Sequence, residues 1–425
     1  MKNKLLGTSA LIAVLTAAAA HVSADAGQAP TMSMSGNAKF QAYGFSNSKG
    51  VSANNTNNAV ARPSYGYGQG YAFTQNGELD FVVAGVAANG LEYNYTLILT
   101  GDTSAQNAIQ ENRIEFKGNW GTFQAGDKVG PEDILMTDAA NVLGATGGFD
   151  GDWNKVINET SGVFTGDSMM ADTGTTTKVV YYTPRFSGFM LGAAFTPSSA
   201  HKGNAIINTN GATGGNGSVG SGYNNHGVSS GALNFSHEFT NGFGMSLTAA
   251  GINASSSKSN SGALAQKSLR TMSAWQLGGL FNYQGWQLGL GYLDNQKSGT
   301  MSNSVTTGSP LSGYNGGKAW SGALGYTFGD NKVAFGYQGT TQNNGKSGST
   351  QYKGKADIYS VTADHTLAPG LGVYAEYDYL RMRIPNAALA QLANNQVINN
   401  VNSSTGNQTS SNNASVFILG TKISF

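Results

Sequence analysis

Residues 275–292 read WQLGGLFNYQGWQLGLGY, in which large apolar side chains alternate with polar or small ones. Trp275, Leu277 and Phe281 would share one face of a β-strand, whereas a helix would scatter them around its axis. Gln284-Gly285 interrupts the alternation with a glycine-containing step of the kind that tight hairpin turns require. The stretch therefore predicts an antiparallel hairpin with one apolar face.

The same alternation recurs along the chain in about sixteen segments of roughly ten residues each. The expected strands are 36–46, 71–86, 91–101, 110–118, 121–128, 178–184, 189–196, 231–240, 243–252, 273–284, 286–294, 318–328, 332–340, 356–367, 371–382 and 414–425.

The connections between these segments alternate in length. Short ones such as Asn89-Gly90, Asn241-Gly242 and Pro369-Gly370 carry turn-forming residues. The long ones are rich in Gly, Ser, Asn and Thr, and they are 47–70, 129–177, 197–230, 253–272, 295–317, 341–355 and 383–413. Short turns on one rim and long loops on the other are typical of a transmembrane antiparallel β-barrel of the outer membrane, with periplasmic turns and extracellular loops.

Composition supports a barrel with one face in lipid and one in water. Charged residues make up 11% of the chain, glycines number 60, and there is no cysteine. Because unpaired backbone groups are costly in lipid, strands can cross it only as a closed barrel. A soluble all-β repeat protein or a glycine-rich adhesin would also alternate. Neither needs the rhythm of short and long connections or a final strand that ends on an aromatic residue, Phe425.

The N-terminal segment predicts export. Lys2 and Lys4 precede an apolar run, and Val22-Ser23-Ala24 offers small residues for cleavage. We therefore expect residues 1–24 to be a signal peptide and residues 25–425 to form a single β-barrel domain. Of the 24 basic residues, 22 remain without the two lysines, against 23 acidic ones. This balance gives no reason to expect a nucleic-acid partner.

Two internal motifs resemble those of a known family. Residues 111–127 read ENRIEFKGNWGTFQAGD and residues 179–189 read VVYYTPRFSGF. Together with the C-terminal Phe425, they resemble the fourth and fifth strands, the hairpin after the third loop, and the terminal strand of Gram-negative trimeric general-diffusion porins of the alphaproteobacterial type. The resemblance implies a homotrimer in the outer membrane, in contact with lipid and lipopolysaccharide. It also implies that the barrel-assembly machinery reads Phe425 as an assembly signal.

In that family the third loop folds into the lumen and narrows it opposite a row of basic residues. The corresponding loop here is 129–177, and it is strongly acidic. Its acidic candidates are Glu132, Asp133, Asp138, Asp150, Asp152, Glu159, Asp167 and Asp172. The basic candidates, three of inward parity and one at the loop base, are Lys39, Arg113, Lys117 and Lys128. The family's Pro-Glu-Phe-Gly-Gly-Asp turn is absent. Residues 147–152, which read GGFDGD, contain similar residue types in a different order. The alternative is that these acids are solvated loop residues.

Other chemistries find little support. Asp150, Asp152 and Asn154 have the spacing of the first ligands of a calcium loop, but Lys155 and Ser161 replace the later glycine and glutamate. We expect no cofactor beyond incidental Ca²⁺ binding and no structural metal. Asp364-His365 is the one suggestive catalytic pair, and adjacent strand residues point to opposite faces. We therefore expect no enzymatic activity.

The sequence thus predicts passive diffusion of small hydrophilic solutes and ions, with weak cation preference from the acidic loop. The alternatives are a substrate-specific channel for a sugar or an anion, and a surface adhesin or receptor whose long loops bind a partner. Inward aromatic residues such as Tyr182 and Tyr374 are too few to form a sugar-binding ladder.

Overall fold

The computed structural model describes residues 27–47, 70–102, 108–157, 163, 165–166, 169, 173–199, 201–203, 223–259, 271–298, 315–347, 350–385 and 409–425. The expected signal peptide, residues 1–24, lies outside them. Among the residues described, no helix is both long and apolar enough to cross a membrane.

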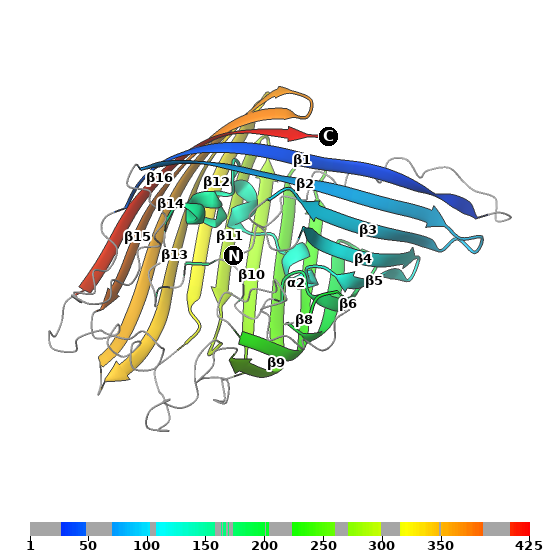
Figure 1. The fold of residues 1–425 in the computed structure, drawn as a ribbon, viewed down its shortest axis with the longest axis horizontal. Helices are drawn as coiled ribbons and strands as arrows, with labels where there is room; N and C mark the ends of the chain where they lie inside the picture. Colours follow the sequence, from blue (N-terminus) through cyan, green and yellow to red (C-terminus); the bar gives the residue numbers. More distant parts are fainter. Residues whose placement is uncertain are drawn as a thin grey trace.

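Sixteen strands form one closed antiparallel barrel (Figure 1). They are β1 (Gln28–Asn47), β2 (Tyr71–Val86), β3 (Glu92–Thr100), β4 (Ile109–Gly118), β5 (Gly121–Asp127), β6 (Thr177–Tyr182), β7 (Phe189–Ser198), β8 (Tyr223–Glu238), β9 (Gly244–Ser259), β10 (Ser273–Tyr283), β11 (Trp286–Asp294), β12 (Lys318–Phe328), β13 (Asn331–Ser347), β14 (Thr350–Ala368), β15 (Leu371–Pro385) and β16 (Thr409–Ser424).

The first and last strands close the barrel. β1 pairs with β16 in a register that places Asn37 opposite Ser424. Beyond that pair, the Gly36 amide donates to the Phe425 carbonyl at 2.8 Å and the Phe425 amide donates to Gly36 at 3.1 Å. The C-terminal residue therefore takes part in the seam, and no sheet edge is left open there.

All sixteen predicted segments are strands, but several are longer than predicted. β1 begins at Gln28 rather than 36, and β8 begins at Tyr223 rather than 231. The predicted long loop 341–355 is wrong, since β13 continues to Ser347 and β14 begins at Thr350. Residues such as Gln342 and Asn343 are polar on both faces because this end of the hairpin rises beyond the apolar band, so hydrophobic alternation does not reveal it.

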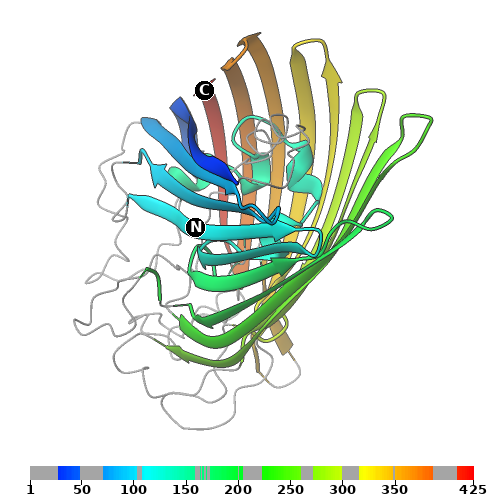
Figure 2. The same cartoon turned by 90° about the vertical axis from the view of Figure 1, so that its right-hand side faces the viewer.

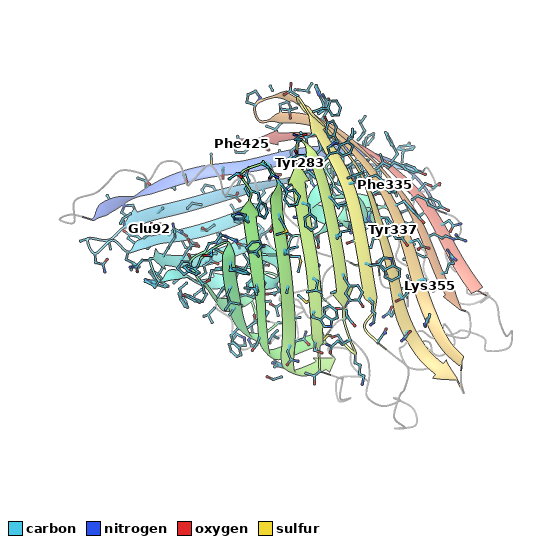
Figure 3. All side chains as sticks on the ribbon, turned by 180° about the vertical axis from the view of Figure 1, so that it is seen from behind. Glu92, Tyr283, Phe335, Tyr337, Lys355 and Phe425 are labelled. Carbon is cyan, nitrogen blue, oxygen red and sulfur yellow. The ribbon has the colours of Figure 1, made fainter. Side chains whose placement is uncertain are left out.

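Outward and inward side chains differ as the alternation predicts. On β12, Trp320 and Leu324 are exposed on the outer face, whereas Ala319 and Ala323 are buried inside. Phe335 and Tyr337 project outward from β13 (Figure 3). The strands thus present apolar and aromatic side chains to lipid.

The described residues of the third loop, between β5 and β6, lie inside the barrel (Figure 2). Its short helical turns are α2 (Pro131–Ile134), η1 (Ala139–Val142), η2 (Gly148–Asp150) and η3 (Asp152–Lys155). α2 packs near β7–β9, η1 near β10–β13, and η2 near β13–β15. The loop therefore follows the inner wall from β7 to β15.

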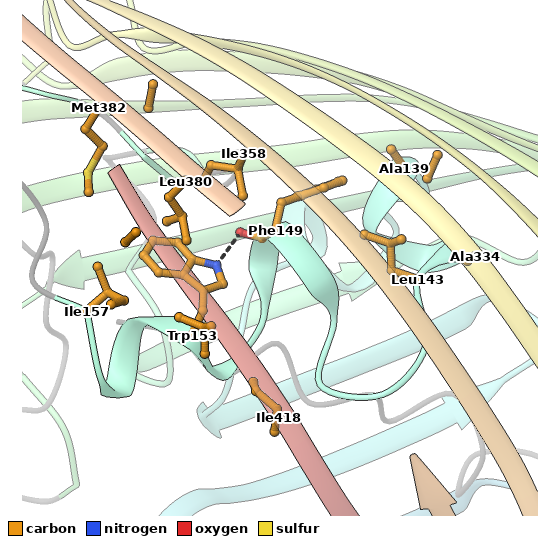
Figure 4. Close-up of a cluster of buried hydrophobic side chains, with 14 of the residues drawn as sticks. Ala139, Leu143, Phe149, Trp153, Ile157, Ala334, Ile358, Leu380, Met382 and Ile418 are labelled. Carbon is orange, nitrogen blue, oxygen red and sulfur yellow. Dashed lines mark hydrogen bonds between the residues drawn. The ribbon is translucent and has the colours of Figure 1, made fainter. Parts of the chain in front are cut away.

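An apolar cluster anchors the far part of this loop. Phe149 and Trp153 are buried among the inward side chains of Ile358, Leu380 and Ile418 (Figure 4). Trp153 Nε1 donates to the Phe149 carbonyl at 3.0 Å. The inner wall of β14–β16 is therefore apolar where the loop covers it.

Candidate functional site

Hydrogen bonds hold the third loop on the wall of β14 and β15. The Ala145 amide donates to Asp364 Oδ1 at 2.8 Å. The Thr146 amide and hydroxyl donate to the two carboxylate oxygens of Glu376 at 2.8 and 2.6 Å. The Gly148 amide adds a third bond to Glu376 at 3.2 Å. Glu376 thus satisfies the backbone at a turn that would otherwise leave buried donors unpaired.

Asp152 connects the loop to β1. Its carboxylate accepts from Lys39 Nζ at 2.8 Å and from Gln41 Nε2 at 2.7 Å, and it pairs with Lys155 at 3.2 Å. Burial alone would raise the pKa of Asp152, but attraction to Lys39 and Lys155 and the hydrogen bonds from Lys39 and Gln41 hold it below its usual value. The sequence-predicted acid Asp152 and base Lys39 are therefore in direct contact.

Asp138 fastens the near part of the loop. It caps η1 by accepting from the Ala140 amide at 3.0 Å, and Gln276 Nε2 on β10 donates to it at 3.1 Å. Asp138 is buried, as is Glu132 at the loop base, while Asp133 and Asp150 are half-buried. Glu159, Asp167 and Asp172 lie outside the described residues.

Two further basic candidates, Arg113 and Lys117, lie on the inner face of β4. Arg113 on β4 pairs with Glu111 of its own strand, and Lys117 pairs with Glu92 across the sheet at 2.9 Å. Lys117 is the more exposed of the two cations, with 41% of its side chain accessible against 17% for Arg113. Each predicted base except Lys128 therefore has a carboxylate partner among the residues described.

Lys128 stands at the base of the loop, directly after β5. It donates to Gln124, and its carbonyl accepts from Lys178 Nζ at 2.5 Å. Burial, followed by repulsion from Arg113, lowers the pKa of Lys128 to about 7. Its charge therefore changes near neutral pH.

The sequence did not predict a role for the acidic residues on the inner face of β2–β4, which the loop does not cover and which is called here the free wall. They occupy inward positions on β2, β3 and β4 and are Glu78, Asp80, Glu92, Glu111 and Glu115. The alternation that gave Arg113 and Lys117 their inward parity applies equally to these residues, so the signal was present. Asn94 Nδ2 donates to Glu115 at 2.8 Å, so even the uncharged side chains here are polar.

The two walls and the loop define a candidate constriction. The loop covers the inner face of β7–β16 and meets Lys39 and Gln41 on β1, while the inner face of β2–β4 keeps a polar surface carrying charges of both signs. The structure brings Lys39 and Asp152 together and leaves Arg113 and Lys117 on the wall that the loop does not cover. Within the described part of the chain, no group of three or more histidine or acidic residues is arranged to hold a metal ion.

Comparisons with known proteins agree with this architecture. A family model described as Gram-negative porin matches residues 8–384. A sequence comparison with curated proteins finds no match.

Among solved structures, the chain is similar to the outer-membrane protein OmpT of Vibrio cholerae in a trimer form, at 13% identity. The alignment covers 94% of this chain and 100% of that one, with a TM-score of 0.52. A variant of the Rh. blastica porin aligns over 93% of this chain and 100% of its own, at 13% identity and a TM-score of 0.50. At these identities the likeness shows a shared barrel fold.

Proposed function

The chain belongs to the Gram-negative porin family, and we propose that it lets small hydrophilic solutes and ions diffuse passively through a water-filled pore, with weak preference for cations. Its place is the outer membrane, which it crosses with the sixteen strands. The observation that carries the proposal is the third loop inside the barrel, fastened on one wall and facing a charged wall on the other.

The charges of the free wall support a cation preference. Inward acids on β2–β4 outnumber the inward bases Lys39, Arg113 and Lys117 on β1–β5. A narrow tube with low-dielectric walls concentrates the field of such charges, and rings of charged side chains bias ion flow. All three of these bases are paired with carboxylates, so the residual field is negative but small.

A substrate-specific channel is the second candidate. Sugar selection would need flat aromatic rings facing the lumen, but the inward rings of Tyr43, Tyr182 and Tyr374 are each at most 7% exposed. They are therefore not available for stacking against a solute. The geometry favours selection by size and charge.

We propose that the protein carries out no chemical step, uses no cofactor and binds Ca²⁺ only incidentally. No observation on the described residues favours an adhesin or receptor.

The proposal extends to the oligomeric state of the protein and to its assembly in the membrane. We propose a homotrimer in which each protomer holds its own pore, supported by the trimer form reported for the OmpT structure. Phe425 is 60% exposed at the barrel seam, so its side chain is available to the barrel-assembly machinery. Membrane lipid and lipopolysaccharide would surround the trimer.

The test is electrical. The purified protein, reconstituted in a planar lipid bilayer, should give large conductance steps in groups of three that rise roughly linearly with salt. Across a KCl gradient the zero-current potential should favour K⁺. Silence, or a small conductance that one solute blocks saturably, would reject general diffusion in favour of a specific channel.

A further inference from the structure

The two ends of the third loop meet at a single buried side chain. Lys178, the second residue of β6, has only 2% of its surface exposed. Its ammonium donates to the carbonyl oxygen of Lys128 at 2.5 Å and also to the carbonyl oxygen of Gly174. Lys128 begins the loop directly after β5, and Gly174 lies close to its end, before β6. One cation therefore joins both ends of the loop, and these two bonds are called here the Lys178 clasp.

The backbone alone joins the two ends only weakly. Among the described residues, one backbone hydrogen bond connects residues 128–134 with residues 173–176, from the Lys128 amide to the Thr176 carbonyl at a long 3.4 Å. Gly174 has a φ of +54°, which residues with a side chain rarely adopt, so the turn that presents its carbonyl to Lys178 depends on this glycine. The side chain of Lys178 thus provides the shorter connection between the two ends.

A buried ammonium needs an opposite charge nearby, and Glu132 is placed to supply it. The acids that attract Lys178 most strongly are Glu132, Asp133 and Asp127. Glu132 is 2% exposed, and neither of its carboxylate oxygens has a hydrogen-bond partner among the described residues. The carboxylate is folded back on the loop base, because a Cβ placed on Gly130 would collide with it. Glu132 is therefore placed to balance the charge of Lys178 rather than to meet a solute.

The first segment of the loop, residues 128–134, is called here the near leg, and it lies far from the apolar cluster around Trp153. Beyond the clasp, the next attachment along the chain is the Leu135 carbonyl, which accepts from Thr248 Oγ1 at 2.7 Å. Between these two points Ile134 is 55% exposed, although the loop lies inside the barrel. The near leg therefore stands at the lumen with one attachment at each of its ends.

We propose that Lys178 is a positioning residue for permeation, because its clasp fixes where the near leg stands in the lumen and so sets the open width beside it. Without the ammonium, the carbonyls of Lys128 and Gly174 would be buried and unpaired, and Glu132 would be a buried charge without its balancing cation. The near leg would relieve these costs by moving into the water of the lumen. The inference rests on the proposed function only for its electrical consequence.

The chain offers a matched set of variants. Lys178→Met keeps a long unbranched side chain but removes the charge and every donor, whereas Lys178→Arg keeps both. Glu132→Gln removes the balancing charge and keeps the shape. The control Lys332→Met removes a lysine that is half-buried on β13 and has no hydrogen bond or ion pair with another described residue. Heat-modifiable migration on gels establishes that each barrel folds.

Two measurements report on the near leg. Because the chain has no cysteine, a single nitroxide label can be attached through Ile134→Cys on the near leg or through Ala140→Cys on η1, and its mobility read by electron paramagnetic resonance in detergent. Single-channel records in planar bilayers give the frequency of closures.

Lys178→Met should raise the label mobility at position 134 but not at position 140, and closures should become about tenfold more frequent. Lys178→Arg should restore both readouts to within about threefold of the wild type. Glu132→Gln should change them in the same direction as Lys178→Met but less. Lys332→Met should match the wild type in both.

Three results would overturn the inference. Equal mobility at position 134 in Lys178→Met and the wild type would show that the clasp does not hold the near leg. The same increase in Lys332→Met would attribute the effect to a lost charge rather than to lost bonds. A failure of Lys178→Arg to restore mobility would assign the effect to the shape of the lysine alone.

If Lys178→Met does not fold, Glu132→Gln takes its place, and unchanged mobility in that variant would also overturn the inference. A protein whose near leg loosens as expected but which does not conduct would instead reject the proposed function and leave the role of Lys178 standing.

Discussion

Strands β2–β4 and strands β14–β16 both turn every second side chain inward, but the side chains differ in kind. The first group presents polar residues such as Asn94, Arg113 and Glu115, and the second presents Ile358, Leu380 and Ile418. The difference follows the third loop, which covers the second group and leaves the first uncovered. A barrel interior therefore needs to be polar only where water reaches it, and elsewhere it can hold an ordinary apolar core.

The largest expected effect comes from breaking the covered wall. Trp153→Ala removes the largest side chain of the loop from the apolar cluster and should weaken loop attachment by about 3–5 kcal/mol. In planar bilayers we expect noisy, fluctuating open-channel currents, because the loop is no longer held. The control Trp120→Ala removes an exposed ring on the lipid face and should leave the noise unchanged. Quiet currents in Trp153→Ala would show that the cluster does not hold the loop.

A smaller effect is expected from the polar part of the same attachment. Glu376→Gln keeps the shape but replaces one accepting oxygen with a donor, so one of the three loop donors loses its acceptor at a cost of about 1–3 kcal/mol. Brief closures should become more frequent in single-channel records. Glu238→Gln, at the exposed end of β8, serves as the control. The idea fails if the two variants give the same closure frequency.

The point where the loop meets the free wall should govern selectivity. Asp152→Asn leaves Lys39 and Lys155 uncompensated and should shift the zero-current potential toward Cl⁻. Lys39→Gln should shift it toward K⁺. Each change is expected to alter the permeability ratio by about twofold to fivefold. The double variant removes both charges and should return close to the wild-type ratio. Shifts of the same sign in both single variants would exclude this pair as a determinant of selectivity.

The fold could be read from sequence because a period of two is a local pattern, visible in each strand without knowledge of its neighbours. It failed at Gln342 and Asn343, where the strand leaves the membrane and both faces are polar. The parity of Lys39 and the acidity of Asp152 were also visible, but their contact joins residues 113 apart in the chain. Likewise, Glu376 meets Thr146 across 230 positions, and no local pattern encodes such a pairing. The charges of the site were therefore predictable, whereas the surface on which the loop rests was not.

The smallest effect concerns pH at the base of the loop. Burial lowers the pKa of Lys128 to about 7, so this side chain is charged at lower pH and becomes neutral as the pH rises through that value. From about pH 6 to about pH 8, the loss of one positive charge should increase the preference for K⁺ by up to about twofold. Lys128→Gln is neutral throughout and should reduce the slope of this part of the profile. The carboxylate of Asp152, whose pKa is held below its usual value, stays charged over the same range and contributes no slope. An unchanged slope in Lys128→Gln would place the titrating group elsewhere in the pore.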